Sequence, residues 1–337
     1  MRTVEIAGGG VAGLALGLAL RREGVPVRVH EAGVYPRHRL CGEFISGAGP
    51  EDFERLGISH LYHRSEVLTE VLWFKGDRLL QRRTLPVPAR GISRWQLDAG
   101  MAECLTKAGG ELLCENRVPV SGGEGWVVAT GRPRAESGPW LAQKAHYQNL
   151  PTEAGLEMHL GTGGYTGLAR VENGTVNVCS LFPASLGRLS ASATHADRLR
   201  AGGLPALAAR LEAAQLIEAS RCGVSGFVTG WQPHAADIFA LGDHRAIIPP
   251  FTGHGVSMAM LAALEAAPFL VRWSSGRLTW NDAVKATRLA LKEKFRRRLR
   301  WASLLHPWLL RPGGQTALSF LVRCGLLPWP WIFRRLR

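Results

Sequence analysis

The sequence predicts an α/β fold made of a Rossmann-like three-layer domain, an antiparallel β-sheet inserted into it, and a helical C-terminal region. Two observations predict the first domain: a glycine-rich βαβ pattern fills residues 1–31, and a strand ending in Gly-Asp follows at 238–243. Between them, residues 144–184 contain short strand-like runs broken by glycines, which is typical of an antiparallel sheet. The first domain is therefore expected to be discontinuous.

A glycine motif follows the first predicted strand. Gly8, Gly10 and Gly13 have G-x-G-x-x-G spacing and precede an Ala/Leu-rich helix. The first glycine permits a tight turn, the second lets the backbone approach a pyrophosphate, and the third lets helix pack on strand. The helix begins near Val11 and Ala12, where unpaired N–H groups and the helix dipole favour negative charge. The pattern predicts a dinucleotide phosphate site.

Glu31 and Ala32 follow the second predicted strand, which covers residues 25–30. Glu31 stands about 20 residues beyond Gly10, where an acidic side chain accepts hydrogen bonds from ribose hydroxyls. A carboxylate there disfavours a 2′-phosphate. The dinucleotide is therefore expected to be FAD or NAD rather than NADP.

The remaining elements are expected in the following order. Helices are predicted at 50–56, 97–108, 189–214, 256–271 and 281–310, and strands at 66–90, 111–114, 126–132, 156–160, 166–171, 175–182 and 238–243. Asn173-Gly174 is a strong hairpin signal. The expected division is 1–65, 91–143 and 233–275 for the dinucleotide-binding domain, 66–90 and 144–232 for the inserted substrate sheet, and 276–337 for the basic helical region.

Charge is distributed unevenly along the 337 residues, which carry a formal net charge of +14. From Lys285 onward there are 13 Lys and Arg residues and one acid, Glu293, so nearly all of the excess lies in this tail. Tryptophans cluster there with leucines. Such a basic amphipathic end fits an anionic membrane surface or an acidic carrier protein. The alternative is that these helices cover the substrate pocket with a solvated basic face. Nucleic acid is disfavoured, because the tryptophans do not alternate with a basic platform.

Six cysteines contain no CxxC pair, so no metal site or disulfide framework is expected. Met1 leads directly into the first strand, and no apolar run of about 18 residues is free of charges. We expect a cytoplasmic protein with reduced thiols, with peripheral contact to the inner membrane face as a further option.

A second ligand motif is predicted where the Rossmann-like pattern returns. Asp243 ends a strand, and a glycine loop then leads into a helix at Gly255. This arrangement supplies a carboxylate for sugar hydroxyls and N–H donors for an anion. A structural alternative is that Asp243 only caps the next helix.

These segments, in this order, resemble a flavoprotein family that includes aromatic hydroxylases of the para-hydroxybenzoate hydroxylase type, flavin-dependent halogenases and geranylgeranyl reductases. The likeness covers about residues 1 to 275. Gly242-Asp243 matches the flavin motif whose aspartate binds the ribityl chain, and Pro249–Gly255 match the P-x-x-G-x-G loop beside the isoalloxazine. Arg94 and Asp98 match an R-x-x-L-D segment near the phosphates. Thr130-Gly131 replaces the hydroxylases' Asp-Gly motif.

The resemblance implies FAD and a set of site residues. The cofactor-binding residues that it implies, together with the glycine motif, are Gly8, Gly10, Val11, Ala12, Gly13, Glu31, Ala32, Arg39, Cys41, Gly42, Arg94, Thr130, Gly131, Gly242, Asp243, Pro250, Gly253, His254, Gly255 and Val256. The candidate catalytic residues are Cys41, Glu43, Pro250 and His254. No metal ligands are expected.

Two candidates have structural alternatives. The segment Arg39–Glu43 resembles the Cys-Gly segment of geranylgeranyl reductases, so Cys41 is a proton donor, a substrate contact or a small buried residue. His254 either hydrogen-bonds flavin or substrate, or caps a helix.

The leading hypothesis is an FAD-dependent monooxygenase that hydroxylates an apolar or aromatic small molecule of secondary metabolism. Without a second Rossmann motif, NADH or NADPH is expected to bind transiently as the electron donor. A reductase of an isoprenoid or polyketide double bond is the first alternative, with Cys41 or Glu43 as proton donor. A flavin-binding docking protein without turnover is the second. The W-x-W-x-I-P motif that marks halogenases is absent.

Overall fold

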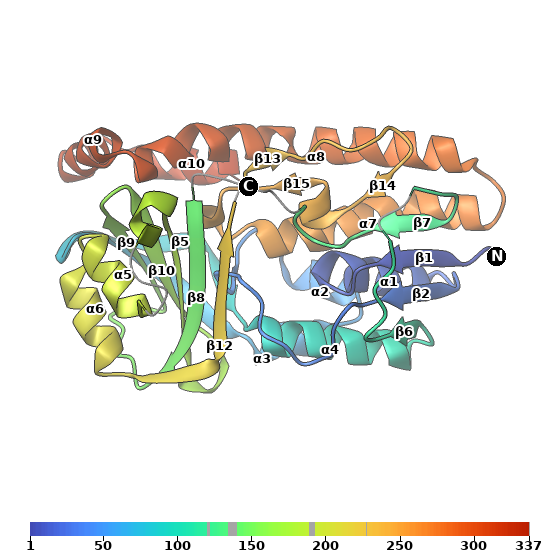
Figure 1. Ribbon diagram of the computed structural model, residues 1–337. Coiled ribbons are helices and arrows are strands. Elements are labelled where there is room, and N and C mark those ends of the chain that lie inside the picture. The colour runs from blue at the N-terminus through green and yellow to red at the C-terminus, as the bar shows by residue number, and fades with distance from the viewer. Residues whose placement is uncertain (120–121, 134–139, 189–192, 227, 337) are drawn as a thin grey trace.

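The computed structural model describes residues 1–337 except 120–121, 134–139, 189–192, 227 and 337. Its first unit is a five-stranded parallel sheet in the order β14-β7-β1-β2-β6 (Figure 1). All four strand pairs are parallel, which confirms the predicted Rossmann-like domain and its return late in the chain. The strands are β1 (Val4–Ala7), β2 (Val27–His30), β6 (Glu111–Leu113), β7 (Trp126–Val128) and β14 (Phe239–Ala240).

Three helices pack together beside this sheet. Helix α1 (Val11–Arg22) contacts both α4 (Arg94–Lys107) and α7 (Gly255–Ser274), and its residues from Val11 to Leu20 are all buried. Within the described part of the chain, α7 alone is long and apolar enough to cross a membrane. However, 67% of its most apolar window is buried, since α1 and α8 cover it. Helix α7 is therefore placed as a core helix.

The turn between β1 and α1 shows why two of its glycines are needed. Gly8 has a φ of +106°, and a Cβ there would lie 2.4 Å from the carbonyl oxygen of Ala129. A Cβ on Gly13 would lie 1.9 Å from the carbonyl oxygen of Gly8. Because neither backbone can retreat, only glycine lets strand, turn and helix approach this closely.

The second unit is an eight-stranded sheet in the order β12-β8-β11-β10-β9-β4-β5-β3. Helices α5 (His195–Ala201) and α6 (Pro205–Glu212) lie beside it, at the left of Figure 1. The Asn173-Gly174 turn joins β10 to β11 as predicted, and both residues have positive φ. The strands are β3 (Phe44–Ile45), β4 (Glu66–Lys75), β5 (Arg78–Gly91), β8 (Trp140–Gln148), β9 (Leu156–Gly161), β10 (Gly164–Arg170), β11 (Val176–Pro183) and β12 (Gln215–Ser225).

This sheet differs from the sequence-based prediction in three ways. It is mixed rather than purely antiparallel, because β4 and β9 pair in parallel after the chain has passed through the first domain. Strand β8 begins at residue 140, before the boundary expected at 144, and β3 adds residues 44–45 to the sheet edge. Strand β12 was not predicted. Most of its side chains are exposed or half-buried, so its sequence has no clear alternation of apolar and polar residues. Of the helical region predicted at 189–214, residues 189–192 lie outside the described residues.

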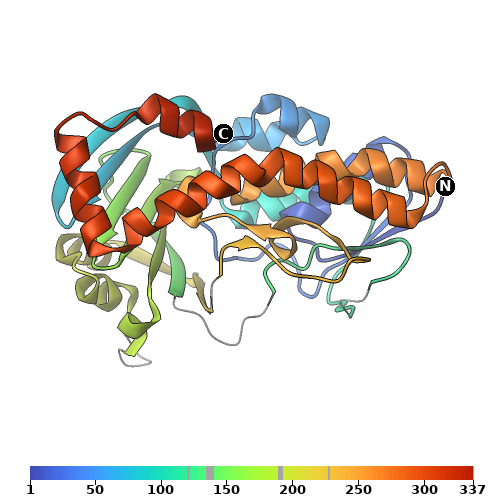
Figure 2. The same ribbon diagram turned by 90° about the horizontal axis from the view of Figure 1, so that it is seen from above.

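The C-terminal region is helical, as predicted. Helix α8 (Trp280–Leu310) packs against α7 along the molecule, and α9 (Pro312–Arg323) and α10 (Trp329–Leu336) fold back toward β4 and β5 (Figure 2). The remaining elements are short: helices α2 (Pro50–Arg55) and α3 (Ser59–Arg64), and the two-stranded pair β13 (Gly230–Trp231) and β15 (Ala246–Ile247).

Candidate functional site

The phosphate cradle is predicted at the N-terminus of α1. Gly10 is its N-cap residue, in extended conformation, and no side chain caps the helix. A Cβ on Gly10 would meet only one atom within 4 Å, the Nη2 of Arg94 at 3.9 Å. The first N–H groups of the helix therefore face a space bordered by a guanidinium, which suits a pyrophosphate.

Glu31 is buried beside this cradle and is already hydrogen-bonded. Its Oε2 accepts from the Gly9 N–H at 2.9 Å, and its Oε1 accepts from the Gly33 N–H at 3.0 Å. Arg39 and Arg37 pair with the same carboxylate at 3.0 and 3.3 Å. Burial alone would raise the pKa of Glu31, but the arginines and the Gly33 N–H outweigh it and lower the pKa. Ribose hydroxyls would share this carboxylate with the arginines.

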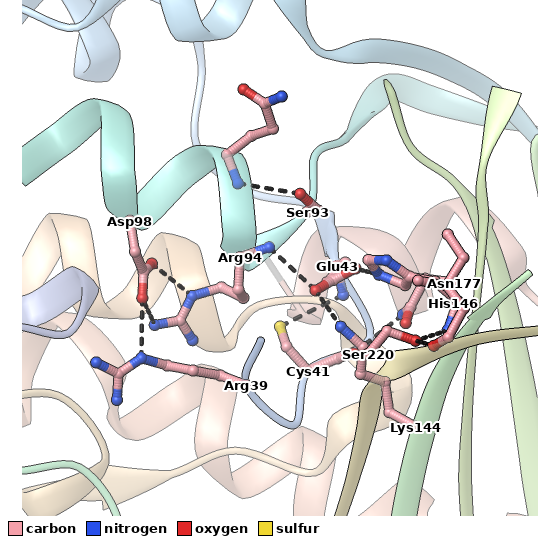
Figure 3. A network of polar contacts seen from close by, with 12 residues as sticks. Arg39, Cys41, Glu43, Ser93, Arg94, Asp98, Lys144, His146, Asn177 and Ser220 are labelled. Atoms are coloured by element: carbon pink, nitrogen blue, oxygen red, sulfur yellow. Dashed lines mark hydrogen bonds and ion pairs between the residues drawn. The ribbon is translucent and has the colours of Figure 1, made fainter. Parts of the chain in front are cut away.

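Arg39, Arg94 and Asp98 form a buried charge cluster next to the same helix end (Figure 3). The Arg94 guanidinium donates to both Asp98 oxygens at 2.7 and 2.6 Å, and Arg39 Nε lies 3.0 Å from the same carboxylate. Asp98 is fully buried. Burial lowers the pKa of Arg94, but the adjoining Asp98 carboxylate more than reverses this and raises it. One carboxylate thus holds two cations beside the predicted phosphate position.

Asp243 lies in the turn Gly242–His244, directly after β14, the last strand of the parallel sheet along the chain. Burial raises its pKa, and the charges of Arg94 and Arg132 oppose that rise. Among the described residues, no hydrogen bond reaches the Asp243 carboxylate. Thr130 Oγ1 lies 3.3 Å from Nδ1 of His244, so the Thr130-Gly131 segment borders this turn. An exposed carboxylate that accepts no hydrogen bond from the described residues, at the end of a parallel strand, fits a polyhydroxyl chain.

Two segments predicted to border a flavin ring lie side by side, although about 200 residues separate them. The Ser46 N–H donates to the Gly253 carbonyl at 3.0 Å, and Ser257 Oγ donates to the Ser46 carbonyl at 2.6 Å. The turn Pro250–Thr252 comes directly before Gly253. His254 is the buried N-cap residue of α7, and the helix start has no side-chain cap bond. Gly255 and Val256 start the helix, so its first N–H groups are available to an anion.

Glu43 is the centre of a network that sequence reasoning did not find. Its carboxylate accepts from the Arg94 N–H at 3.0 Å, from Lys144 Nζ at 2.7 Å and from His146 Nε2 at 2.5 Å (Figure 3). The side chains of Glu43 and Lys144 are fully buried. Lys144 and His146 lie on β8, about 100 residues away, where residues 144–148 alternate polar and apolar side chains. That alternation indicates a strand but does not link it to Glu43.

The network keeps Glu43 ionised. Burial alone would raise its pKa, but the hydrogen bond from His146 and the charge of Lys144 lower it instead. Glu43 also has a φ of 58°, so its backbone is held in the left-handed region. A carboxylate held in this way is an anchor between helix α4 and strand β8 of the inserted sheet. It is a poor source of protons.

Cys41 is adjacent and keeps its proton. The Glu43 N–H points at Cys41 Sγ at 3.3 Å, and the Asn177 side chain donates to the Cys41 carbonyl at 3.0 Å. Burial raises the pKa of the Cys41 thiol, with Arg94 opposing. Asn177 lies on β11, and the partners of Glu43 lie on β8. Both neighbours of Gly42 in the chain are therefore bonded to the inserted sheet.

An apolar cavity of about 250 Å³ opens beside the Pro250 turn. Its walls come from β4, β5 and β9 of the inserted sheet, from Phe251, Thr252 and His254 of the turn, and from α8, α9 and α10. The C-terminal region therefore covers this cavity. One of the two expectations for that region was that its helices cover the substrate pocket. Phe44 and Gly47 connect the cavity to the segment containing Cys41 and Glu43.

No metal cluster competes with this interpretation: among the described residues, no group of three or more His, Cys, Asp or Glu side chains could hold a metal ion. The uncapped starts of α1 and α7, the open side of Gly10 and the Asp243 acceptor together fit an extended dinucleotide.

The fold is that of solved FAD-dependent monooxygenases and flavin-dependent halogenases. PqsL of Pseudomonas aeruginosa, solved with 2-aminobenzoylacetate, aligns with a TM-score of 0.73 and 18% identity over 95% of this chain and all of its own. The flavin-dependent brominase Bmp2 aligns with a TM-score of 0.78 and 17% identity over 99% of this chain and 93% of its own.

A third similar structure is p-nitrophenol 4-monooxygenase PnpA of Pseudomonas putida DLL-E4, with a TM-score of 0.74 and 13% identity, covering 100% of this chain and 97% of that one. No family model matches the sequence. No curated protein matches it either. At these identities the likeness establishes the fold, as the sequence resemblance predicted.

Proposed function

We propose that this chain is an FAD-dependent monooxygenase that hydroxylates an apolar or aromatic small molecule, with NADH or NADPH as electron donor. The observation that carries the proposal is the apolar cavity, which adjoins the Pro250 turn and the uncapped start of α7. A dinucleotide seated on α1 and Asp243 would end at this helix start. The fold, shared with PqsL and PnpA, supports the same conclusion.

The residues that would hold FAD come from both halves of the Rossmann-like domain. The N–H groups after Gly10 and the Arg94 guanidinium would bind the pyrophosphate, and Glu31 would accept from the ribose. Asp243 would accept from the ribityl hydroxyls. The N–H groups at Gly255 would favour negative charge on the flavin. When bound, FAD would take up hydride from the nicotinamide and pass electrons to O₂ or to a substrate.

The chain's own residues would shape the reaction space. Most of the cavity wall is apolar, so it would exclude water and select an apolar substrate. The Glu43 network would fix the segment from Cys41 to Phe44 against the inserted sheet. His254 would lie between the cavity and the helix start, in reach of both.

Double-bond reduction is the second candidate, favoured by one observation. The Cys41 thiol is kept protonated by burial next to the predicted flavin position, so it could supply a proton. Glu43 does not suit that role because Lys144 and His146 hold it as a carboxylate. The reductase alternative therefore depends on Cys41 alone.

The test is a visible spectrum followed by product masses. The purified protein should be yellow and should oxidise NADH or NADPH in air. A colourless protein that takes up no FAD would refute both enzymatic proposals. FAD uptake without turnover of any apolar substrate would instead support the non-catalytic docking alternative.

Mass analysis separates the two reactions. With a panel of apolar aromatic compounds, a product heavier by about 16 Da supports oxygenation, and one heavier by about 2 Da without O₂ supports reduction. A Cys41→Ser variant sharpens the distinction. It should retain most oxygenation but lose reduction, because serine is a much weaker acid than the thiol.

A further inference from the structure

Large apolar side chains are exposed on the helices that cover the cavity. Leu304 and Trp308 on α8 are 52% and 44% exposed, Phe320 on α9 is 63% exposed, and Leu326 in the following turn is 63% exposed. We call these four residues the apolar rim. Trp308 also lines the cavity, so the rim meets the cavity at this residue. An exposed apolar group of this kind at a binding site indicates a partner surface.

Arginines flank the rim on the same helix faces. Arg300, Leu304 and Trp308 follow one another at spacings of four residues and are all exposed, so they share one face of α8, and exposed Arg311 caps the end of the same helix. Arg323 lies three residues after Phe320 on the exposed face of α9. No Asp or Glu follows Glu293, whereas ten Lys and Arg residues do.

Cationic side chains bordering protruding Trp, Leu and Phe side chains are the pattern of helices that lie in a membrane interface. The arginines match anionic headgroups, and the apolar side chains match the acyl boundary beneath them. A soluble acidic partner would match the charges only. Because exposed Trp308 lines the cavity, the cavity extends to the surface that would face lipid.

We propose that the apolar rim and its flanking arginines dock on an anionic lipid bilayer, and that the cavity receives an apolar substrate from the lipid side. The docking proposal rests on the apolar rim and its flanking arginines and does not depend on the proposed function. The substrate route rests on the proposed function, because it requires the cavity to be the substrate site.

Vesicle flotation tests the docking. The FAD-loaded protein should float with vesicles of phosphatidylcholine and phosphatidylglycerol and remain at the bottom with phosphatidylcholine alone, and added salt should release it. Equal behaviour with both vesicle types would overturn the proposal. FAD content is measured on the same samples, so failure to bind FAD is distinguished from failure to dock.

Two variants separate charge from apolar contact. Leu304→Ser/Phe320→Ser/Leu326→Ser removes rim residues that do not line the cavity, and Arg300→Glu/Arg311→Glu reverses two charges. The charge variant should lower vesicle affinity at least about fivefold, since one cation near the surface contributes about that factor. The apolar variant should also lower it, because it removes side chains that would be buried at the acyl boundary. Leu289→Ser is the matched control, because Leu289 is 68% exposed at the other end of α8. Loss of binding in the control, or unchanged binding in the triple variant, would contradict the assignment.

The native cysteines give a site-specific readout. Cys324 lies between Phe320 and Leu326 and is exposed, as is Cys114 after β6. An environment-sensitive fluorophore on Cys324, in a Cys114→Ser background, should shift to shorter wavelength with anionic vesicles. The same label on Cys114, in a Cys324→Ser background, should not. A shift at Cys114 instead would place a different surface on the bilayer.

Discussion

Replacing Lys144 by methionine should destabilise the protein strongly, because it leaves Glu43 buried without its cation. The side chains of Lys144 and Glu43 are both fully buried, with Nζ and Oε1 2.7 Å apart. Removing one partner of such a pair costs about 3–5 kcal/mol. An unfolding entropy of about 2.1 cal/mol/K per residue gives about 0.7 kcal/mol/K for this chain, so the melting temperature should fall by about 4–7 °C.

The pH dependence identifies the cause. In the native protein, the lowered pKa of Glu43 contributes stability above its unfolded value, and this contribution is lost as pH falls through the folded pKa. Without Lys144, less opposes the effect of burial, so the folded pKa of Glu43 should rise. The deficit of Lys144→Met should therefore be full at pH 7 to 8, shrink as pH falls below the ordinary carboxyl value of about 4.3, and vanish below the lowered folded pKa of the native protein.

A double variant supplies the control. Glu43→Gln/Lys144→Met removes the charge as well as its partner, so it should unfold at a higher temperature than Lys144→Met alone at neutral pH. Thermal unfolding followed by circular dichroism, at several pH values, measures both. A Lys144→Met deficit below about 1 kcal/mol, or one that does not change with pH, would refute the ion-pair reasoning.

Three further predictions concern the cradle and the inserted sheet. Gly13→Ala should destabilise the FAD-free protein by at least about 1–3 kcal/mol through its clash with the Gly8 carbonyl, whereas Gly10→Ala should fold normally yet bind FAD weakly; equal unfolding temperatures would contradict this. Asp243→Ala should lower FAD affinity at least about tenfold, measured by equilibrium dialysis, and wild-type affinity would remove Asp243 from the site. Arg210 and His159 lower the pKa of buried Glu157 to about 2, so stability from Glu157 should be lost as pH falls from 4.5 toward 2, and Glu157→Gln should flatten that limb of an acid titration.

The parts of the fold that were predicted from the sequence are those specified by residues close together in the chain. The turn from Gly8 to Gly13 is specified by positions where only glycine fits, and Asn173-Gly174 specifies its hairpin within two residues. The Rossmann-like return at Gly242-Asp243 was found because the same strand-and-glycine pattern recurs. Each of these signals can be interpreted without knowing which distant residues lie nearby.

The parts that were missed depend on distant partners. Glu43 was singled out, but the lysine and histidine that hold it lie on β8, and no local pattern links the two segments. The parallel pairing of β4 with β9 depends likewise on where the first domain returns the chain. In the reductase alternative Glu43 was one of two expected proton donors, whereas its contacts with Lys144 and His146 lower its pKa.

The position of β14 has a consequence for how the protein is made. Strand β14 supplies one edge of the parallel sheet and α7 covers α1, yet both follow more than 230 residues of other chain. During synthesis, β7 keeps an unpaired edge until residues 239–240 emerge, and the side of α1 that packs on α7 stays uncovered until α7 is complete. The dinucleotide cradle is thus among the last parts to close, so the nascent chain passes through most of its length before it can hold a cofactor.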